Sequence, residues 1–317
     1  MTRMLVKRIL LGLVILWAVS VVVFLATQAL PGDAARAILG REATPERLAA
    51  LREQLHLNEP LWIQYFSWLG NIFQLDLGES YANGMPVTEL LSSRLTNSLA
   101  LMLCATLISV PLSILVGTYS ALRRDKAFDH TTSVISLVLA SLPEFVVGIL
   151  LVLLFSTGVL NLLPAVYVMT GTGSAWSDPV QLILPTLTMV LAVSPYIIRI
   201  MRATMIEVLE SEYVQQARLK GMPERTVILR HALPNAIGPV AQVIALQLAW
   251  LAGGVVIVEF LFRFPGIGFA LVDAVNNRDL PVVQTLTLAI AAVYIVVNLL
   301  ADVVSLAANP KVRSAAR

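Results

Sequence analysis

Residues 215–236 read QQARLKGMPERTVILRHALPNA, a basic stretch between two long apolar runs. Three residues in it favour the ends or starts of helices: Gly221, Pro223 and Pro234. Glycine after a helix adopts the left-handed conformation that closes the last turn, so Gly221 is a predicted C-cap. Proline suits the start of a helix and not its interior. We therefore expect a second short helix that begins near Pro223 and is stopped by Pro234.

The residues before this glycine predict the first helix of the pair. Thr204–Leu219 has amphipathic spacing, with glutamates early and Arg218 late, followed by Lys220. This order of charges stabilises the helix dipole. The stretch thus predicts a helix–turn–helix projection, which is too regular in pattern for a linker.

The composition indicates that the flanking apolar runs lie in a membrane. The 317 residues are 57% hydrophobic and 13% charged, whereas soluble domains carry about 25% charged residues. A net charge of +2 without a long basic run gives no sign of nucleic-acid binding. The single cysteine, Cys104, forms no internal disulfide and is expected to act as a small hydrophobic residue.

Six apolar stretches reach the roughly 20 residues that a spanning helix needs. The first could be a signal peptide, but about 22 apolar residues exceed the usual 7–15 of such a segment, so a retained span is expected. No strand-like alternation dominates, and we predict an all-α membrane protein. The predicted spans are about 9–30, 98–122, 131–159, 181–200, 237–261 and 282–307.

The lysines and arginines predict the orientation of these spans. Most of the 22 basic residues fall in four segments that six crossings place on one side: 1–8, 123–126, 199–230 and 311–317. Basic residues are enriched in cytoplasmic loops. Both termini and the opening stretch are therefore expected in the cytoplasm. The predicted division is 1–30 (N-terminus and first span), 31–97 (outer helical loop) and 98–317 (five-span core with a cytoplasmic loop at 200–236).

The outer loop, 31–97, is too polar to span and has helical spacing. Thr44 is a predicted cap for a helix that starts near Pro45. Residues 61–69 form an amphipathic segment rich in aromatic residues, which either packs on the ends of the spans or forms a docking surface for an outside partner. The apolar stripe before it consists of Leu48, Leu51, Leu55 and Leu57.

Motifs for catalysis are absent from the sequence. None of the four lysines is followed by Ser or Thr, so no phosphate-binding loop of the G-x-x-x-x-G-K-[ST] type exists. The three histidines lie far apart and no G-x-S-x-G is present, which argues against a metal site or a serine-hydrolase elbow. A membrane enzyme is thus the weaker class.

A few polar residues inside the apolar stretches are candidates for the wall of a solute path, because such residues usually face protein or water. The alternative is a charge near a helix end or a helix–helix contact, which is favoured for Glu259 and Asp302. The path candidates are Ser141, Glu144, Glu259 and Asn298, with Ser109, Ser113 and Gly148 as further small residues that also suit close helix packing.

The opening stretch resembles the cytoplasmic loop E-A-A-x3-G-x9-I-x-L-P of ATP-binding-cassette importer permeases. Ala217, Gly221, Leu233 and Pro234 match at the full spacing, while Gln215, Gln216 and His231 depart from it. The variant A-R-x-K-G with R-H-A-L-x-N is similar to the dipeptide and oligopeptide permease branch. So are LPGD, LREQLHLNEPLWIQYFSWL, D-L-G-x-S at 76–80, VEFLFRFPGIGFALVDAVNNRDLPVVQ and NPKVR, where Asn309 replaces an aspartate.

This resemblance implies a type I importer permease fold and a transport role without enzyme activity. It implies four partners: a second permease, two ATPase subunits that carry ATP and Mg, and an extracytoplasmic solute-binding protein. The chain itself is expected to bind no cofactor, and to sit in the bacterial inner membrane. The residues implied to couple to the ATPase are Glu212, Ala217, Gly221, Arg225, His231, Leu233 and Pro234.

Dipeptides or short oligopeptides are the expected solutes, with nickel or opines as alternatives within the family. A channel or an ion-coupled carrier is the alternative from another class. A channel needs a selectivity constriction and a carrier usually shows two similar halves, and neither is visible in the sequence.

Overall fold

The structure, a computed structural model, describes residues 2–29, 43–54, 58–157, 160–168 and 175–308, which form helices and no strand. The α-helices are α1 (Thr2–Ala29), α3 (Pro45–Gln54), α4 (Leu61–Phe73), α5 (Val87–Leu122), α6 (Ala127–Ser141), α7 (Glu144–Val152), α8 (Ile183–Leu209), α9 (Glu212–Leu219), α10 (Glu224–Thr226), α11 (Leu233–Phe262), α12 (Ile267–Asn277) and α13 (Leu280–Ala308). Two π-helical turns follow α7 and α10, at Leu153–Thr157 and Val227–Ala232, and two 3-10 turns at Ala175–Ser177 and Pro179–Leu182 lead into α8.

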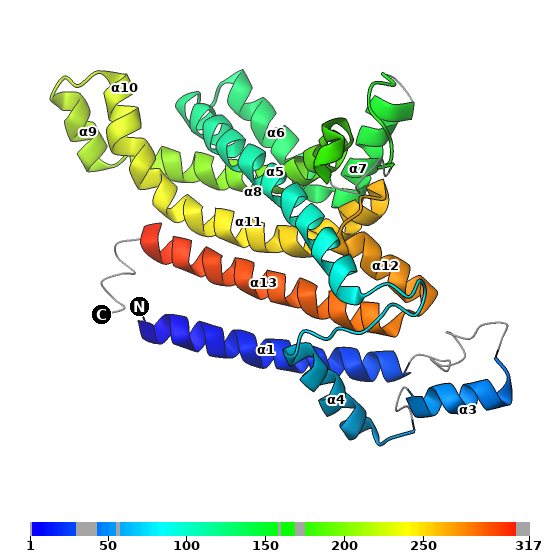
Figure 1. Cartoon of the computed structure of the whole chain (residues 1–317). Coiled ribbons are helices and arrows are strands. Elements are labelled where there is room, and N and C mark those ends of the chain that lie inside the picture. Colours follow the sequence, from blue (N-terminus) through cyan, green and yellow to red (C-terminus); the bar gives the residue numbers. More distant parts are fainter. Residues whose placement is uncertain (1, 30–42, 55–57, 158–159, 169–174, 309–317) are drawn as a thin grey trace.

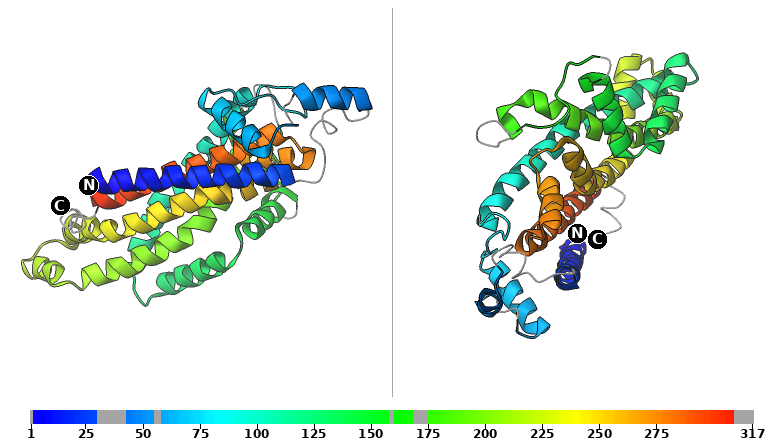
Figure 2. Two further views of the ribbon diagram at one scale, coloured as in Figure 1. Left: turned by 90° about the horizontal axis from the view of Figure 1, so that it is seen from below. Right: turned by 90° about the vertical axis from the view of Figure 1, so that its right-hand side faces the viewer.

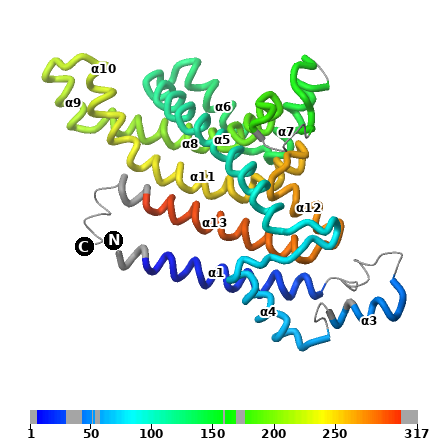
Figure 3. Tube along the Cα trace, in the orientation of Figure 1, coloured from blue at the N-terminus to red at the C-terminus, as the bar shows by residue number. Residues whose placement is uncertain are grey.

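The long helices lie side by side in the order α1, α13, α11, α8, and α5 crosses α8 (Figures 1 and 2). One end of this bundle carries α9, α10, the start of α1 and the end of α13 (Figure 3). We call it the α9 end. The opposite end, the α12 end, carries α3, α4 and α12. Three of the four basic segments of the sequence, 2–8, 123–126 and 199–230, therefore gather at the α9 end, and the fourth lies outside the described residues.

Five helices of the described chain are long and apolar enough to cross a membrane, and the bent pair α6–α7 makes a sixth if it is one span. They correspond to the six predicted spans. The predicted second span was too short, because α5 begins at Val87 rather than near residue 98. Val87 is fully buried against Ile267 and Leu286, so the first turn of α5 packs on α12 and α13 at the α12 end.

The third predicted span, 131–159, is not one straight helix. Its two halves, α6 and α7, meet at an angle of 107°. Pro143 precedes α7, and Leu142 before it has an extended backbone, with φ −91° and ψ 134°. Because proline disfavours helical geometry at the preceding residue, the chain must turn here before a helix can resume.

Small residues four apart allow α5 and α8 to pack closely. Ser109, Ser113 and Gly117 are all buried at this contact, where Met201 of α8 has no exposed surface. A Cβ atom at Gly117 would lie 2.7 Å from Met201 Cβ and 2.9 Å from the Ile198 carbonyl oxygen. Small residues at this spacing let two helix backbones approach in a membrane. Ser109 and Ser113 therefore serve close helix packing, the alternative to a path wall that the sequence offered for them.

Two loops at the α12 end are tied together by Asp279, which lies between α12 and α13 and is 3% exposed. Its carboxylate accepts hydrogen bonds from the Ser80 hydroxyl and from the backbone amides of Tyr81, at 3.0 Å, and Ala82, at 3.3 Å. This contact joins the loop before α5 to the turn before α13, across almost 200 residues of sequence.

The aromatic segment α4 packs partly on α1. Tyr65 and Trp68 place their rings 5.4 and 5.7 Å from that of Phe24, and the Tyr65 hydroxyl lies 2.9 Å from that of Ser20. Trp62 on the other face is 65% exposed. The predicted cap of α3 is confirmed, since the Thr44 hydroxyl accepts from the Arg47 amide at 3.3 Å.

Parts of the expected outer loop lie outside the described residues. These are the LPGD segment at 30–33, and Leu55 and Leu57 of the apolar stripe; nothing is described of the Leu51 side chain either. Leu48 of the same stripe is buried, at 8% exposure. Asn309 and the rest of the NPKVR tail also fall outside.

Replacing Gly117 by alanine should destabilise the fold by about 1–3 kcal/mol, since the added methyl group overpacks the α5–α8 contact. Gly70→Ala on α4 is the matched control, because no atom lies within 4 Å of the position that the new Cβ would take, and alanine favours helix. Thermal unfolding in mild detergent should show a lower transition temperature for the first variant only. Equal transitions would contradict the close-packing interpretation.

Candidate coupling knob and solute path

The basic stretch around Gly221 forms a compact projection at the α9 end, residues 210–232, which we call the knob (Figure 1). The predicted single helix Thr204–Leu219 is wrong: α8 ends at Leu209 and α9 begins at Glu212. Ser211 has an extended backbone, φ −68° and ψ 149°, and its hydroxyl donates to the Val208 carbonyl. A serine bonded to its own backbone in this way competes with helix and separates the two helices.

Gly221 ends α9 as predicted, with a left-handed φ of 75°. Pro223 then precedes α10, also as predicted. Pro234, however, does not stop the second helix. The chain passes through the π-helical turn Val227–Ala232 into α11, and Pro234 stands in the first turn of α11. Proline is tolerated there because the amide it lacks would have no partner within the helix in any case.

The knob has its own small core. Val214 and Val227 are fully buried and Ala217 is 5% exposed, so α9 packs back onto the π-helical turn. The Arg218 guanidinium closes the arrangement by donating to Glu224 at 2.6 Å. Both side chains are exposed, so this ion pair contributes little stability in water. The knob is held mainly by its buried aliphatic residues.

The predicted coupling residues differ in how far their side chains are exposed, and one of them is buried. Glu212, Gly221, Arg225 and Pro234 are exposed, and His231 and Leu233 are half-buried. Ala217 faces the interior of the knob. The outer face of α9 instead presents Leu219, 86% exposed, and Tyr213, 45% exposed. Sequence reasoning missed these two, although helical spacing places Leu219 on the side of α9 opposite Val214 and Ala217.

A buried ion pair fixes the helices at the base of the knob. Asp129 near the start of α6 is 1% exposed, and Arg202 of α8 donates to its two oxygens at 2.5 and 2.6 Å. The Ser120 hydroxyl of α5 and the Asp125 amide also donate to it, at 2.5 and 3.0 Å. Such a two-pronged arginine contact fixes orientation as well as distance. It joins α5, α6 and α8 just before the knob.

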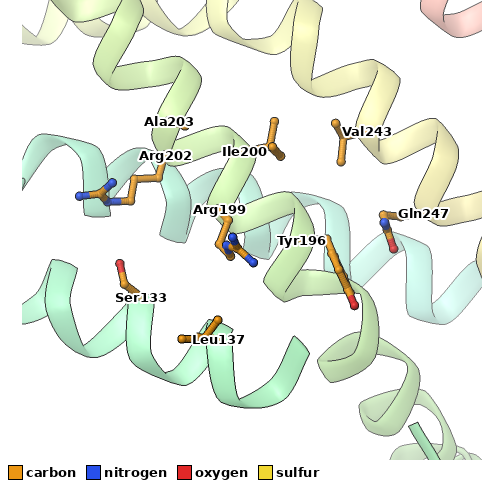
Figure 4. A pocket seen from close by; sticks show the side chains of 9 residues that line it. All are labelled: Ser133, Leu137, Tyr196, Arg199, Ile200, Arg202, Ala203, Val243 and Gln247. Carbon is orange, nitrogen blue, oxygen red and sulfur yellow. The ribbon is translucent and has the colours of Figure 1, made fainter. Parts of the chain in front are cut away.

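A cavity of about 680 Å³ opens between α6, α8 and α11, toward the α9 end. Figure 4 shows Arg199 and Tyr196 of α8 beside it, with Gln247 of α11 and Leu137 of α6 on other sides. Arg202 lines its edge. None of the sequence candidates for a path lines this cavity. The signal that could have found it is Arg199, a basic residue at the end of a predicted span.

A second cavity of about 430 Å³ brings together two of the predicted path residues. Glu144 at the start of α7 and Asn298 of α13 both line it, together with Trp250, Gly253 and Gly254 of α11. The Asn298 amide donates to the Tyr294 carbonyl at 2.9 Å. Helix α11 contributes to both cavities, through Val243 and Gln247 to the first and through residues between 246 and 257 to the second. The path role of Glu144 and Asn298 stays a prediction.

The remaining candidates are placed elsewhere. Ser141 is exposed at the end of α6 and donates to the Val138 carbonyl at 2.7 Å, but it does not line either cavity. Gly148 is buried where α7 meets Leu261 and Thr188, so it permits helix packing. Asp302 of α13 pairs with Arg8 of α1 at 3.1 Å, which is the helix–helix contact that the sequence left as an alternative.

Glu259 is fully buried near the end of α11 and caps the next helix. One carboxylate oxygen accepts from the Ser98 hydroxyl at 2.5 Å, and the other accepts from the Gly268 and Phe269 amides of α12 at 2.7 and 3.3 Å. The Ser98 oxygen in turn accepts from the Ile267 amide at 2.9 Å. An acid at a helix N-terminus satisfies amides that have no partner in the helix. This structural task leaves Glu259 no surface toward a path.

Comparison with known proteins identifies the family. A family model described as "Binding-protein-dependent transport system inner membrane component" matches residues 113–314, and that of the N-terminal region of such components matches residues 1–102. The chain belongs to this family. The two matches together cover nearly the whole permease, including α1, α3 and α4 as well as the helices that carry the knob.

Named relatives resemble the permease over their full length. A probable peptide ABC transporter permease of Sinorhizobium fredii is 35% identical over 308 residues, 97% of this chain and 98% of the relative. A putative peptide transport system permease of Brucella abortus is 35% identical over 313 residues, 99% of both chains. A glutathione transport system permease of Escherichia coli is 38% identical over 314 residues, again 99% of both.

Replacing Glu259 by alanine should destabilise the permease by about 3 kcal/mol or more, because the Ser98 hydroxyl and two α12 amides lose their acceptor inside the protein. Glu144→Ala is the matched control, since this acid lines a cavity and should cost less than about 1 kcal/mol. Detergent thermal unfolding and folded yield would compare them. A Glu144→Ala variant as unstable as Glu259→Ala would contradict this division of roles.

Proposed function

We propose that the chain is the membrane subunit of an ATP-driven importer that carries dipeptides or short oligopeptides. The observation that carries this proposal is the knob, a helix pair turned at Gly221 that projects from α8 and α11, in a chain that matches peptide permeases from end to end. The relatives named for glutathione, which is itself a tripeptide, favour short peptides over nickel or opines.

The knob is proposed to sit in a groove of an ATPase subunit. The chain has no phosphate-binding loop, so ATP and Mg belong on two partner ATPases. The exposed side chains Leu219 and Tyr213 supply an apolar contact, and Arg225 a charge beside it. A second, similar permease and an extracytoplasmic solute-binding protein complete the proposed assembly.

The proposed orientation places the α9 end in the cytoplasm of a bacterial cell and the α12 end outside the inner membrane. The support is the gathering of the described basic segments 2–8, 123–126 and 199–230 at the α9 end, since basic residues are enriched on the cytoplasmic side of a membrane. Both termini then lie inside, and α3 and α4 lie outside, where α4 is available to the solute-binding protein.

The solute path is proposed to follow the two cavities along α11, at the interface with the second permease. Glu144 and Asn298 line one of these cavities. Helices α8 and α11 both line the path and both enter the knob. Closure of the ATPases would therefore move the two helices together and change which side is open, a two-state change that the bound nucleotide biases.

Gly221→Val should uncouple ATP hydrolysis from peptide uptake in proteoliposomes that contain the whole transporter. A β-branched residue at φ 75° is strained by about 1–2 kcal/mol, while no neighbouring atom obstructs the side chain itself. Gly221→Asn is the matched control, because asparagine tolerates this conformation, and it should retain coupling. Leu219→Cys should crosslink to an ATPase subunit. Full coupling in the valine variant, or crosslinks only to the solute-binding protein, would refute the knob assignment.

The orientation predicts that cysteine at Asn83, which is exposed in the loop before α5, reacts from outside the cell. A Cys104→Ala background removes the native thiol. Asn83→Cys should be labelled by a membrane-impermeant maleimide in spheroplasts and protected in inside-out vesicles. Leu219→Cys should show the reverse pattern in a permease without bound ATPase. Labelling of Asn83→Cys from the cytoplasmic face alone would reverse the proposed topology.

A further inference from the structure

Arg199 lies inside a candidate span, and no carboxylate pairs with it among the residues that the structure describes. It lies three residues before Arg202 in α8, which forms most of the candidate span Pro179–Leu209. Arg202 is held by Asp129, whereas no ion pair or hydrogen bond of Arg199 is found within the described part of the chain. Figure 4 shows its side chain directed into the 680 Å³ cavity. A charge at such a position is costly unless it faces water or a counter-charge.

The cavity around Arg199 offers hydrogen-bond donors and no carboxylate. Gln247 of α11 and Ser133 of α6 line it and make no hydrogen bond that the described structure contains. Both are half-buried, so they are reachable from the cavity. The Tyr196 hydroxyl is 3.3 Å from the Ala140 carbonyl and donates to it. A cation with neutral donors around it is complementary to an anion, and a guanidinium matches a carboxylate in shape as well as charge.

We propose that this cavity holds the carboxylate of the solute in transit, with Arg199 as its counter-charge. The inference rests on the proposed function, and it names the chemical group by which this chain recognises a peptide: the free α-carboxylate. A carboxylate that enters a membrane-spanning path loses hydration, and the guanidinium compensates that loss. Because Arg199 is itself exposed and screened, the contact is weak and releases the solute.

The second cavity supports this assignment because an acidic side chain lines it, where the first cavity has a basic one. Glu144 lines it, and the α11 residues beside the two sites, Gln247 and Gly254, are seven positions apart. At 1.5 Å per residue this is roughly 10 Å along the helix. An extended tripeptide spans about 10 Å from its ammonium to its carboxylate. The acid of α7 and the base of α8 each line a cavity beside α11, and this order suits a zwitterion that travels with its carboxylate toward the α9 end.

The decisive test is protection of Arg199 from phenylglyoxal, which modifies accessible arginines, in the purified nucleotide-free transporter with all its subunits. Tri-alanine should slow modification of Arg199, read by mass spectrometry, at least severalfold. Tri-alanine amide, which lacks the carboxylate, should not. Arg123, exposed in the loop after α5 and outside the cavity, is the internal control and should react equally with either peptide.

Equal protection by the acid and the amide would overturn the proposal, because the carboxylate would then play no part. Failure of Arg199 to react under any condition would overturn it too, since another subunit or a lipid phosphate would then cover the guanidinium. These outcomes leave the proposed transport function intact, which fails separately if the wild-type transporter takes up no peptide with ATP.

A transport measurement supplies the second readout. Arg199→Gln should slow ATP-driven uptake of tri-alanine about tenfold at saturating solute-binding protein, the effect expected for loss of one charge-assisted hydrogen bond. Arg199→Lys keeps the charge and should recover most of the rate, and Arg123→Gln should match the wild type. Uptake by Arg199→Gln at the wild-type rate would refute the role of the charge.

Discussion

A backbone amide buried inside a protein has no water to bond with, so a helix can begin or end there only where the protein supplies a partner. This constraint explains where the bundle is interrupted. The start of α12 is satisfied by Glu259 and Ser98, and the turn before α6 by Asp129. Each of these acids also meets a second helix, so the same side chain that permits a break holds the neighbouring elements in place. The turns before α6 and α12 depend on these two buried acids.

The two ends of the molecule use this principle for different purposes. At the α12 end, Glu259 connects α11 to α12 by hydrogen bonds, and Asp279 connects the loop before α5 to the turn before α13. At the α9 end, the Asp129–Arg202 pair joins α5, α6 and α8 immediately before the knob. A displacement of the knob is therefore passed to three spans at once, and α11, which continues from the π-helical turn, passes it to the walls of both cavities.

Local chemistry in the sequence was enough to predict the spans, the cap at Thr44 and the left-handed turn at Gly221, because each depends on residues within a few positions. The breaks were harder. Ser211 and Pro143 interrupt helices whose hydrophobic pattern continues across them. Pro234 lies in the first turn of α11, and the sequence does not show that a π-helical turn leads into this helix. The helix α12 was missed, since its apolar residues resemble the neighbouring spans.

The contacts of the site could not be read from the sequence for a related reason. Asp129 and Arg202 are 73 residues apart, and Ser98 and Glu259 are 161 apart, so nothing local marks them as partners. Glu144 and Asn298 could be singled out as polar residues in apolar runs, and the structure does bring them to one cavity. Arg199 was counted only as a sign of orientation, because its lack of a partner is visible only once Asp129 is seen to take Arg202.

The position of α1 has a consequence for biosynthesis. Its main contact among the spans is α13, through the Arg8–Asp302 ion pair and the hydrogen bond from Gln284 to Thr27. The ribosome makes α13 about 250 residues after α1, which at about 5–20 residues per second is a delay of roughly 13–50 s. During that time α1 waits in the lipid without its neighbour. The first helix to be inserted can therefore pack on its main neighbour only after the last span has been made.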